Sequence, residues 1–188
     1  MIKKIAATGI VLISTMTGCV SPADTSTVAY AKTIQIKNDT NFVEKMSQTQ
    51  QSLFRKATLQ KNSDQIDLML SLLKTRVGKT WYVFSGATPS GWDCSGLVMW
   101  GYGQIGINLE HRATKQANSG FLVDEPVPGD IVVFKYKGYS SAYHVGIYVG
   151  NGKMIHAPRK GEVTRIESIT SFGGNYSSIS YRRLLETI

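Results

Sequence analysis

Hydrophobic and polar positions change their pattern three times along the chain. Two lysines precede an apolar run over residues 5–15, and a small, polar stretch follows over residues 20–37. Apolar residues then recur at near-helical spacing, until aromatics, glycines and short β-prone runs take over after Gly78. This pattern predicts four parts, namely a signal peptide over 1–18, a tether over 19–40, a helical segment over 41–77 and a folded domain over 78–188.

We expect two helices in the helical segment. The first begins at Asn41, which with Glu44 resembles a capping box, and its apolar positions are Phe42, Met46, Leu53 and Ala57. The polar sequence "QKNSD" over 60–64 interrupts it. The second helix runs over 63–77 and ends at Gly78, and its apolar face consists of Ile66, Met69, Leu70 and Leu73.

Helix signals come before strand signals in the remainder of the chain. We expect helices over 94–104 and 113–118, then a buried strand at "IVVF" (131–134). The sequence "HVGIYVGNGKMIHA" predicts two strands joined by a hairpin at Gly150-Asn151-Gly152, and "EVTRI" and "SISYRRLL" predict two more. This order indicates an α+β fold, with helices packed on an antiparallel β-sheet.

The N-terminal sequence is typical of export. "MTGC" resembles a bacterial lipobox with Cys19 as the lipidated residue, although Met16 stands where leucine is favoured. Ordinary secretion with cleavage after the A-x-A sequence at 29–31 and an uncleaved N-terminus are the alternatives. We therefore expect an exported protein in the cell envelope, anchored to the membrane by a lipid on Cys19, or else secreted.

Composition and charge limit the classes of molecule that the chain is expected to bind. The chain is 42% apolar and 18% charged, which is typical of a globular protein, and its net charge is +8. Such a charge suits anionic lipid, acidic wall polymers or nucleic acid. Because the basic residues are scattered and form no basic helix or aromatic-basic motif, nucleic-acid binding is not expected.

One cysteine and two histidines form the candidate reactive group. If Cys19 is acylated or removed, Cys94 has no disulfide partner within the chain, and an unpaired thiol in an exported protein indicates reactive chemistry. Asp93 is placed to cap a helix beginning at Cys94, so the helix dipole should lower the pKa of the thiol. His144 and His156 flank the hairpin turn, which brings them together as neighbours. The third histidine, His111, is expected on the surface.

These sequences resemble the NlpC/P60 family of papain-like cysteine peptidases. The similarity covers about residues 66–185, through "WYVFSG", "GWDCSGLV", "PGDIVVF" and "HVGIYVGNGKMIHAP" in that order. It implies that Cys94 is the nucleophile, that His144 is its general base and that His156 aligns His144. It further implies an oxyanion role for Tyr82, and helix capping with substrate contacts for Asp93 and Ser95. The lipobox points to the lipoprotein branch of the family.

The resemblance also implies a substrate. Members of this family cleave the γ-D-glutamyl bond to a diamino acid in peptidoglycan stem peptides, and they need no metal or organic cofactor. The alternatives are an N-acetylmuramoyl-L-alanine amidase, a phage- or conjugation-associated wall hydrolase using the same residues, and a non-catalytic wall-binding lipoprotein. Three tryptophans, at 81, 92 and 100, are expected either in the core or along the groove.

Overall fold

The computed structural model describes residues 46–187. The expected signal peptide, the tether, the lipidation site at Cys19 and the capping box at Asn41 lie outside the described residues. The chain divides into two compact units, Met1–Gln51 and Ser52–Ile188, and the fold and the site belong to the second. Within residues 46–187, no helix has the length and the apolar character that crossing a membrane requires.

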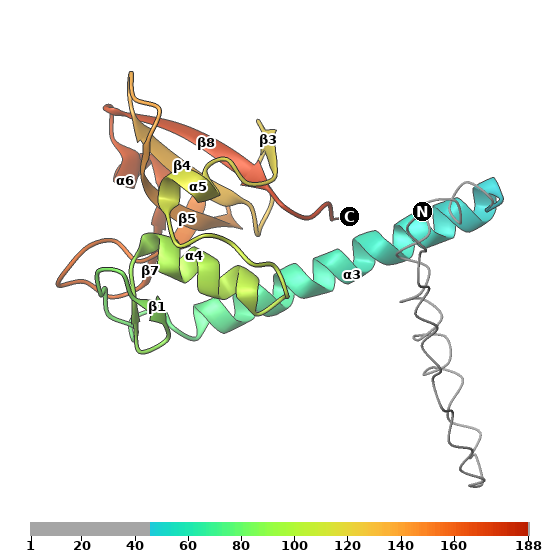
Figure 1. Cartoon of the computed structure of the whole chain (residues 1–188), viewed down its shortest axis with the longest axis horizontal. Coiled ribbons are helices and arrows are strands. Elements are labelled where there is room, and N and C mark those ends of the chain that lie inside the picture. The colour runs from blue at the N-terminus through green and yellow to red at the C-terminus, as the bar shows by residue number, and fades with distance from the viewer. Residues whose placement is uncertain (1–45, 188) are drawn as a thin grey trace, which may run out of the picture. The chain divides into compact units, whose positions relative to one another are not determined.

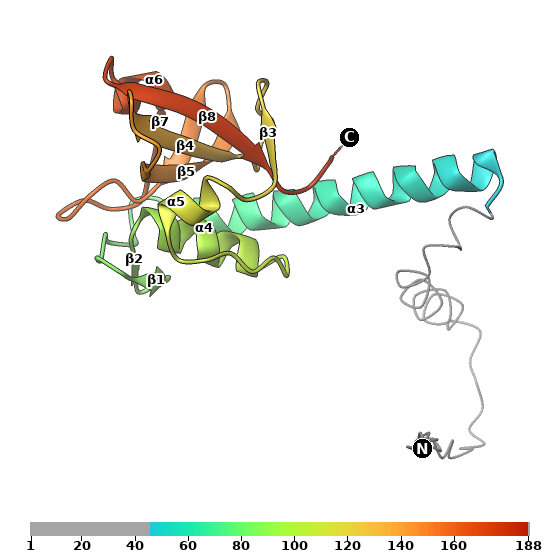
Figure 2. The ribbon, with the colours of Figure 1, turned by 45° about the horizontal axis from the view of Figure 1, so that its top comes forward.

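The second unit packs helices on one antiparallel sheet (Figures 1 and 2). Its helices are α3 (Gln48–Lys74, which begins in the first unit), α4 (Cys94–Gly103), α5 (Ala113–Gln116) and α6 (Ile169–Gly173). The six strands, in the order β3-β8-β4-β5-β6-β7, are β3 (Phe121–Val123), β8 (Ser177–Arg183), β4 (Ile131–Tyr136), β5 (Ala142–Gly150), β6 (Lys153–His156) and β7 (Arg165–Ser168). A separate ribbon pairs β1 (Ala87–Thr88) with β2 (Gly91–Trp92). The predicted α+β class is therefore confirmed.

Helix α3 corrects one prediction, because it continues through the "QKNSD" sequence that was expected to interrupt it. None of these five residues is glycine or proline, so each costs at most about 0.7 kcal/mol of helix propensity. Their side chains also find partners: Gln60 Nε2 donates to Asp64 Oδ1 at 2.9 Å, and Asn62 Nδ2 donates to the Glu186 carbonyl at 2.8 Å. The helix ends at Lys74, and Gly78 follows with a φ of +71°.

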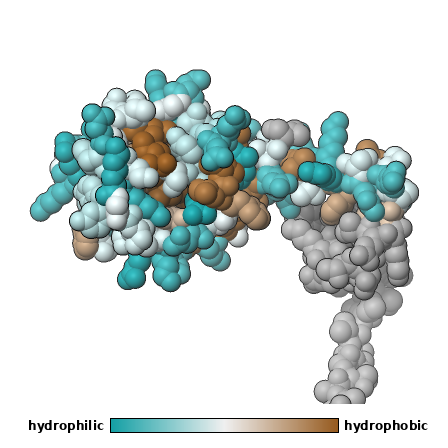
Figure 3. Space-filling model, turned by 90° about the horizontal axis from the view of Figure 1, so that it is seen from above, coloured by the Kyte–Doolittle hydropathy of each residue, from teal (hydrophilic) through white to brown (hydrophobic). Residues whose placement is uncertain are grey.

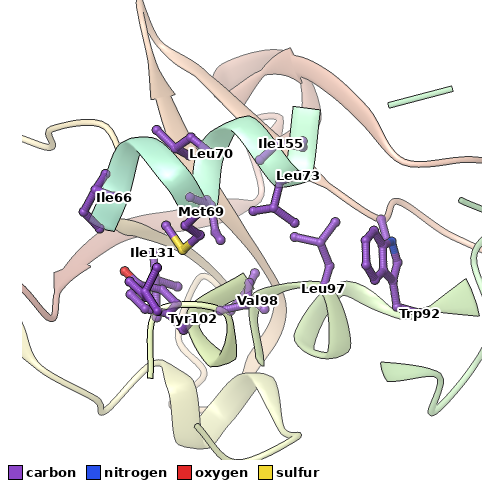
Figure 4. Close-up of a cluster of buried hydrophobic side chains, with 14 of the residues drawn as sticks. Ile66, Met69, Leu70, Leu73, Trp92, Leu97, Val98, Tyr102, Ile131 and Ile155 are labelled. Carbon is purple, nitrogen blue, oxygen red and sulfur yellow. The ribbon is translucent and has the colours of Figure 1, made fainter. Parts of the chain in front are cut away.

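The main core lies between helices α3 and α4 and one face of the sheet. The predicted apolar face of α3 is buried against Trp92 and the apolar side of α4, as Figure 4 shows for Met69, Leu73 and Leu97. Gly101 of α4 permits this approach, because a Cβ there would lie 3.0 Å from Leu73 Cδ1. Gly96 permits a different one, to the loop before α4, since a Cβ there would lie 2.0 Å from the Gly86 carbonyl oxygen.

The other sheet face carries a second cluster of Val132, Phe134 and Met154, covered by Ile169 of α6. Neither α6 nor β3 was predicted, because both are short and lack a clear hydrophobic period. Phe121 and Leu122 of β3 are exposed. Figure 3 shows that apolar side chains gather in patches on a largely hydrophilic surface, which is common in globular proteins.

The predicted hairpin is present and determines where two histidines lie. Gly150, Asn151 and Gly152 all have positive φ values, as a tight turn between β5 and β6 requires. In the resulting register Ile147 pairs with Ile155, so His144 and His156 are diagonal neighbours across the strands.

Trp92 belongs to the core, whereas Trp81 is 58% exposed. We expect Trp92→Ala to lower the free energy of unfolding by about 3–5 kcal/mol, because it opens a cavity and removes the 2.7 Å hydrogen bond from Nε1 to Thr164 Oγ1. Urea unfolding measures this. The matched variant Trp81→Ala should change stability by less than about 0.5 kcal/mol. Equal losses from the two variants would contradict this packing.

Candidate active site

The carboxylate of Asp93 caps the N-terminus of α4, the helix that carries Cys94. Asp93 Oδ1 accepts from the Gly96 N–H at 2.8 Å and from Ser95 Oγ at 2.9 Å, while Oδ2 accepts from the Ser85 N–H at 3.0 Å. The predicted N-cap is therefore confirmed, and Cys94 occupies the first position of α4 as a free thiol. Burial raises the pKa of Asp93, but its hydrogen bonds outweigh this effect and leave the pKa below its usual value.

Two residues outside the predicted set hold this helix start in place. His111 was expected on the surface, yet its Nε2 lies 2.9 Å from Asp93 Oδ1 and it is only partly exposed. Gln116 is fully buried, and its amide donates to the carbonyls of Ser95 and Glu110, each at 2.9 Å. The segment after α4 therefore folds back on the turn that presents Cys94.

The two hairpin histidines are in contact. His144 Nε2 lies 2.8 Å from His156 Nδ1, and the two rings are nearly perpendicular at 89°. Phe172 of α6 covers both, with its ring centroid 4.4 Å from that of His144 and 4.7 Å from that of His156. Gly146, level with His156, leaves little room for a larger residue, because a Cβ there would lie 2.9 Å from Met154 Sδ and 3.2 Å from His156 Cβ.

Burial favours the neutral form of each reactive group. It lowers the pKa of His144 to about 3 and that of His156 to about 2. It also raises the pKa of Cys94 to about 11, although the N–H groups of Val145, Ser95 and Cys94 favour the thiolate. The expected lowering of the thiol pKa by the helix start is therefore wrong for the free site, because desolvation is the larger effect. Transfer of a proton from Cys94 Sγ to His144 would create both charges together.

The position of Glu167 indicates which nitrogen of His156 carries the proton. His156 is fully buried and its Nε2 has no hydrogen-bond partner, but Glu167 Oε2 lies 3.7 Å away. A carboxylate stabilises a nearby N–H and repels a nitrogen lone pair, so we infer a proton on His156 Nε2, although Arg165, which pairs with Glu167, disfavours added positive charge on this ring. His156 Nδ1 then accepts from His144 Nε2–H, which leaves His144 Nδ1 as the free basic atom.

Three of the predicted residues line one cavity. Cys94, His144 and Tyr82 all face a space of about 520 Å³, which also reaches Arg165 and Glu167. Burial, with the proximity of Cys94 and Asp93, raises the pKa of Tyr82, so its hydroxyl remains a hydrogen-bond donor. His156 lies behind His144, and Ser95 is buried in the first turn of α4, with its hydroxyl on Asp93.

Sequence reasoning missed His111, Gln116, Glu167 and Phe172. Gln116 could have been suspected, because it ends the sequence "HRATKQ" (111–116), which resembles a segment of NlpC/P60 proteins. Nothing in the sequence marks Phe172 or Glu167, because the first depends on the packing of a five-residue helix and the second on strand register. No group of three or more His, Cys, Asp or Glu residues in the described part of the chain is arranged to hold a metal ion.

The tautomer assignment can be tested by nitrogen NMR of histidine-labelled protein. We expect the proton of His156 on Nε2 in the wild type. Glu167→Ala should produce a mixture of tautomers, because it removes the carboxylate facing that nitrogen.

Glu162→Ala is the matched control for this measurement. Glu162 pairs with Arg165 at 2.7 Å, as Glu167 also does with that arginine, but no contact joins Glu162 to His156. The control should therefore keep the wild-type tautomer. A His156 proton on Nδ1 in the wild type would overturn the assignment.

Comparison with known proteins finds a matching family model and several similar proteins. The model of the NlpC/P60 family matches residues 78–183. The chain is 40% identical over 109 residues to the probable endopeptidase Rv2190c of Mycobacterium tuberculosis, covering 57% of this chain and 27% of the relative. It is 33% identical over 125 residues to murein DD-endopeptidase MepH of Escherichia coli, covering 62% and 45%.

A further relative is the gamma-D-glutamyl-L-lysine dipeptidyl-peptidase of Bacillus subtilis, 36% identical over 92 residues, which are 47% of this chain and 31% of the relative. The chain thus spans 27–45% of the length of these three relatives. Among solved structures, an NlpC/P60 family protein from Bacillus cereus is similar with a TM-score of 0.58 and 30% identity, over 64% of this chain and 40% of that one. The family model covers more than half of the chain, and the chain belongs to the NlpC/P60 family.

Proposed function

We propose that this chain is a cysteine endopeptidase that cleaves the bond between γ-D-glutamate and a diamino acid in peptidoglycan stem peptides. The observation that supports this most is the cavity shared by Cys94, at the start of α4, and His144, which is backed by His156. A nucleophile, a base and an orienting group in contact are the parts that acyl transfer needs.

The first stage forms a thioester. His144 Nδ1 takes the proton of Cys94 while Sγ attacks the peptide carbonyl, so the two charges develop only as the new bond forms. The N–H groups at the start of α4 and the hydroxyl of Tyr82 stabilise the oxyanion. The His144 imidazolium then donates its proton to the amine of the diamino acid as that amine leaves.

The second stage regenerates the enzyme. Water loses a proton to His144 and attacks the thioester, and the proton returns to Cys94 as the acyl group leaves as a carboxylate. His156 acts through His144, because it holds Nε2–H and keeps Nδ1 directed at the thiol. Phe172 limits access of water to the pair, which strengthens the electrostatic interactions between these groups.

The names of the related proteins specify different bonds. The name of the Bacillus subtilis relative specifies a γ-D-glutamyl bond, whereas that of the Escherichia coli relative specifies a DD-endopeptidase. The proposal follows the first, and the setting follows from the substrate: an enzyme of the cell wall acts outside the cytoplasm. Anchoring of the chain by a lipid on Cys19 remains part of the same proposal.

Digestion of purified peptidoglycan tests this function. Wild-type protein should release new amino groups, and Cys94→Ala should lower the rate by at least about 10³-fold because no thioester can form. His144→Ala should cause a loss of similar size. Full activity of Cys94→Ala would contradict the mechanism.

Mass spectrometry of the digested muropeptides tests the bond. A free amine on the diamino acid, with D-glutamate ending the other fragment, is the expected result. A new amine only at the diamino acid of a D-alanyl cross-link, or at the L-alanine attached to muramic acid, would overturn the proposed bond and indicate a DD-endopeptidase or an amidase.

A further inference from the structure

One side of the cavity that holds Cys94 is a wall of tyrosines. Tyr136, Tyr143 and Tyr176 line the same space as Cys94 and His144. The rings of Tyr136 and Tyr143 are stacked, with centroids 4.3 Å apart and an interplanar angle of 17°. The ring of Tyr176 lies 6.0 Å from that of Tyr136. Strands β4 and β5 and the loop before β8 thus contribute to one aromatic surface that lines the same cavity as Cys94.

One tyrosine of the wall is held by a hydrogen bond, and the rings of the other two are exposed to solvent. Tyr143 is half-buried, and its hydroxyl lies 2.6 Å from Ser177 Oγ. Tyr136 and Tyr176, in contrast, are 48% and 58% exposed. Exposed aromatic rings gathered at a cleft mark a binding surface more often than isolated ones do. The proposed chemistry at Cys94 and His144 makes no use of these rings.

The cavity lining also includes charged side chains. These are Arg159, Arg165 and Glu167, and Glu162 pairs with both arginines. Alanine, glutamate and a diamino acid offer carboxylates, amines and methyl groups, which suit charged partners but provide no broad apolar face. The sugar rings attached to the stem peptide do provide one, since a pyranose presents C–H groups on its face and hydroxyls around its edge.

We propose that the tyrosine wall is a carbohydrate subsite, which stacks an amino sugar of the glycan strand while the attached peptide reaches Cys94. This inference rests on the proposed function for the identity of the peptide, but binding of the sugar is independent of catalysis. The exposed face of Tyr136 or Tyr176 stacks against the sugar ring, and the tyrosine hydroxyls are available to its hydroxyl groups. The enzyme would therefore prefer glycan-linked peptide to free peptide.

Binding is tested by NMR titration of the Cys94→Ala protein with a β-1,4-linked N-acetylglucosamine tetramer, which contains no peptide. We expect the ring signals of Tyr136 and Tyr176 to shift, and Tyr176→Ala to weaken binding about tenfold. Phe121→Ala is the matched control, because Phe121 is an aromatic residue that is 72% exposed and does not line this cavity. No shift of the tyrosine signals, or equal weakening by the control, overturns the proposal.

Kinetics then distinguish a sugar subsite from a peptide subsite. The two substrates are a disaccharide-linked stem peptide and the same peptide carrying only an N-terminal lactyl group, so that the N-terminal amine is acylated in both. We expect kcat/KM to be about tenfold higher for the first, and Tyr176→Ala and Tyr136→Leu to remove that difference without changing hydrolysis of the second.

Each other kinetic outcome is informative. Equal losses on both substrates would show that the wall binds peptide, and unchanged rates on both would show that it is only a surface cluster; either overturns the proposal. If the tetramer binds at the tyrosines but neither substrate is cleaved, the proposed function fails while the carbohydrate subsite stands.

Discussion

The hydrogen bonds of Asp93 determine where the site lies, because they cap α4 so that the helix begins at Cys94. One carboxylate accepts from the N–H groups of Gly96 and Ser85, from the hydroxyl of Ser95 and from His111. It thereby joins the first turn of the helix to the loop before it and to the segment after it. Loss of this cap would cost about 0.5–2 kcal/mol of helix stability and would loosen the turn that positions the thiol.

The sheet positions the other part of the site, the histidine pair, through the register of its strands. The hairpin register brings His144 beside His156, and the lack of a side chain at Gly146 avoids tight contacts with Met154 Sδ and His156 Cβ. Covering the pair with Phe172 excludes water and disfavours charge on either ring. Burial also raises the pKa of Cys94, so both the thiol and the imidazole of His144 are neutral in the free site. In the proposed mechanism their charges form together, as the thiol attacks the substrate carbonyl. Asp93 and the hairpin thus fix the two partners separately, and the core between α4 and the sheet sets their separation.

Local signals in the sequence predicted the parts of this arrangement that depend on near neighbours. Asp93 as the cap, the helix from Cys94 and the turn at Gly150-Asn151-Gly152 each need only a few adjacent residues, and all three are present. The α+β class followed from the order of these elements. The break expected at residues 60–64 was wrong because none of these residues is a helix breaker, and the turns that follow them, from Ile66 to Leu73, bury one face in the core.

The rest depends on contacts between distant parts of the chain. His111 meets Asp93 across 18 residues, and neither its neighbours nor its spacing indicates that contact. The direction of the thiol pKa could not be predicted either, because it reflects the balance between a helix start and burial, and burial is known only once α6 and the sheet are placed. The tyrosine wall likewise joins β4, β5 and the loop before β8, which no single segment of the sequence reveals.

The central claim is that the substrate carbonyl becomes bonded to Cys94 Sγ. The most direct measurement mixes the protein with a stem peptide, quenches the reaction in acid within milliseconds and locates any covalent adduct by mass spectrometry. The account predicts an adduct of the mass of the acyl fragment, ending in γ-D-glutamate, on the peptide that contains Cys94. An acyl adduct on any other residue, formed at the rate at which product appears, would contradict it.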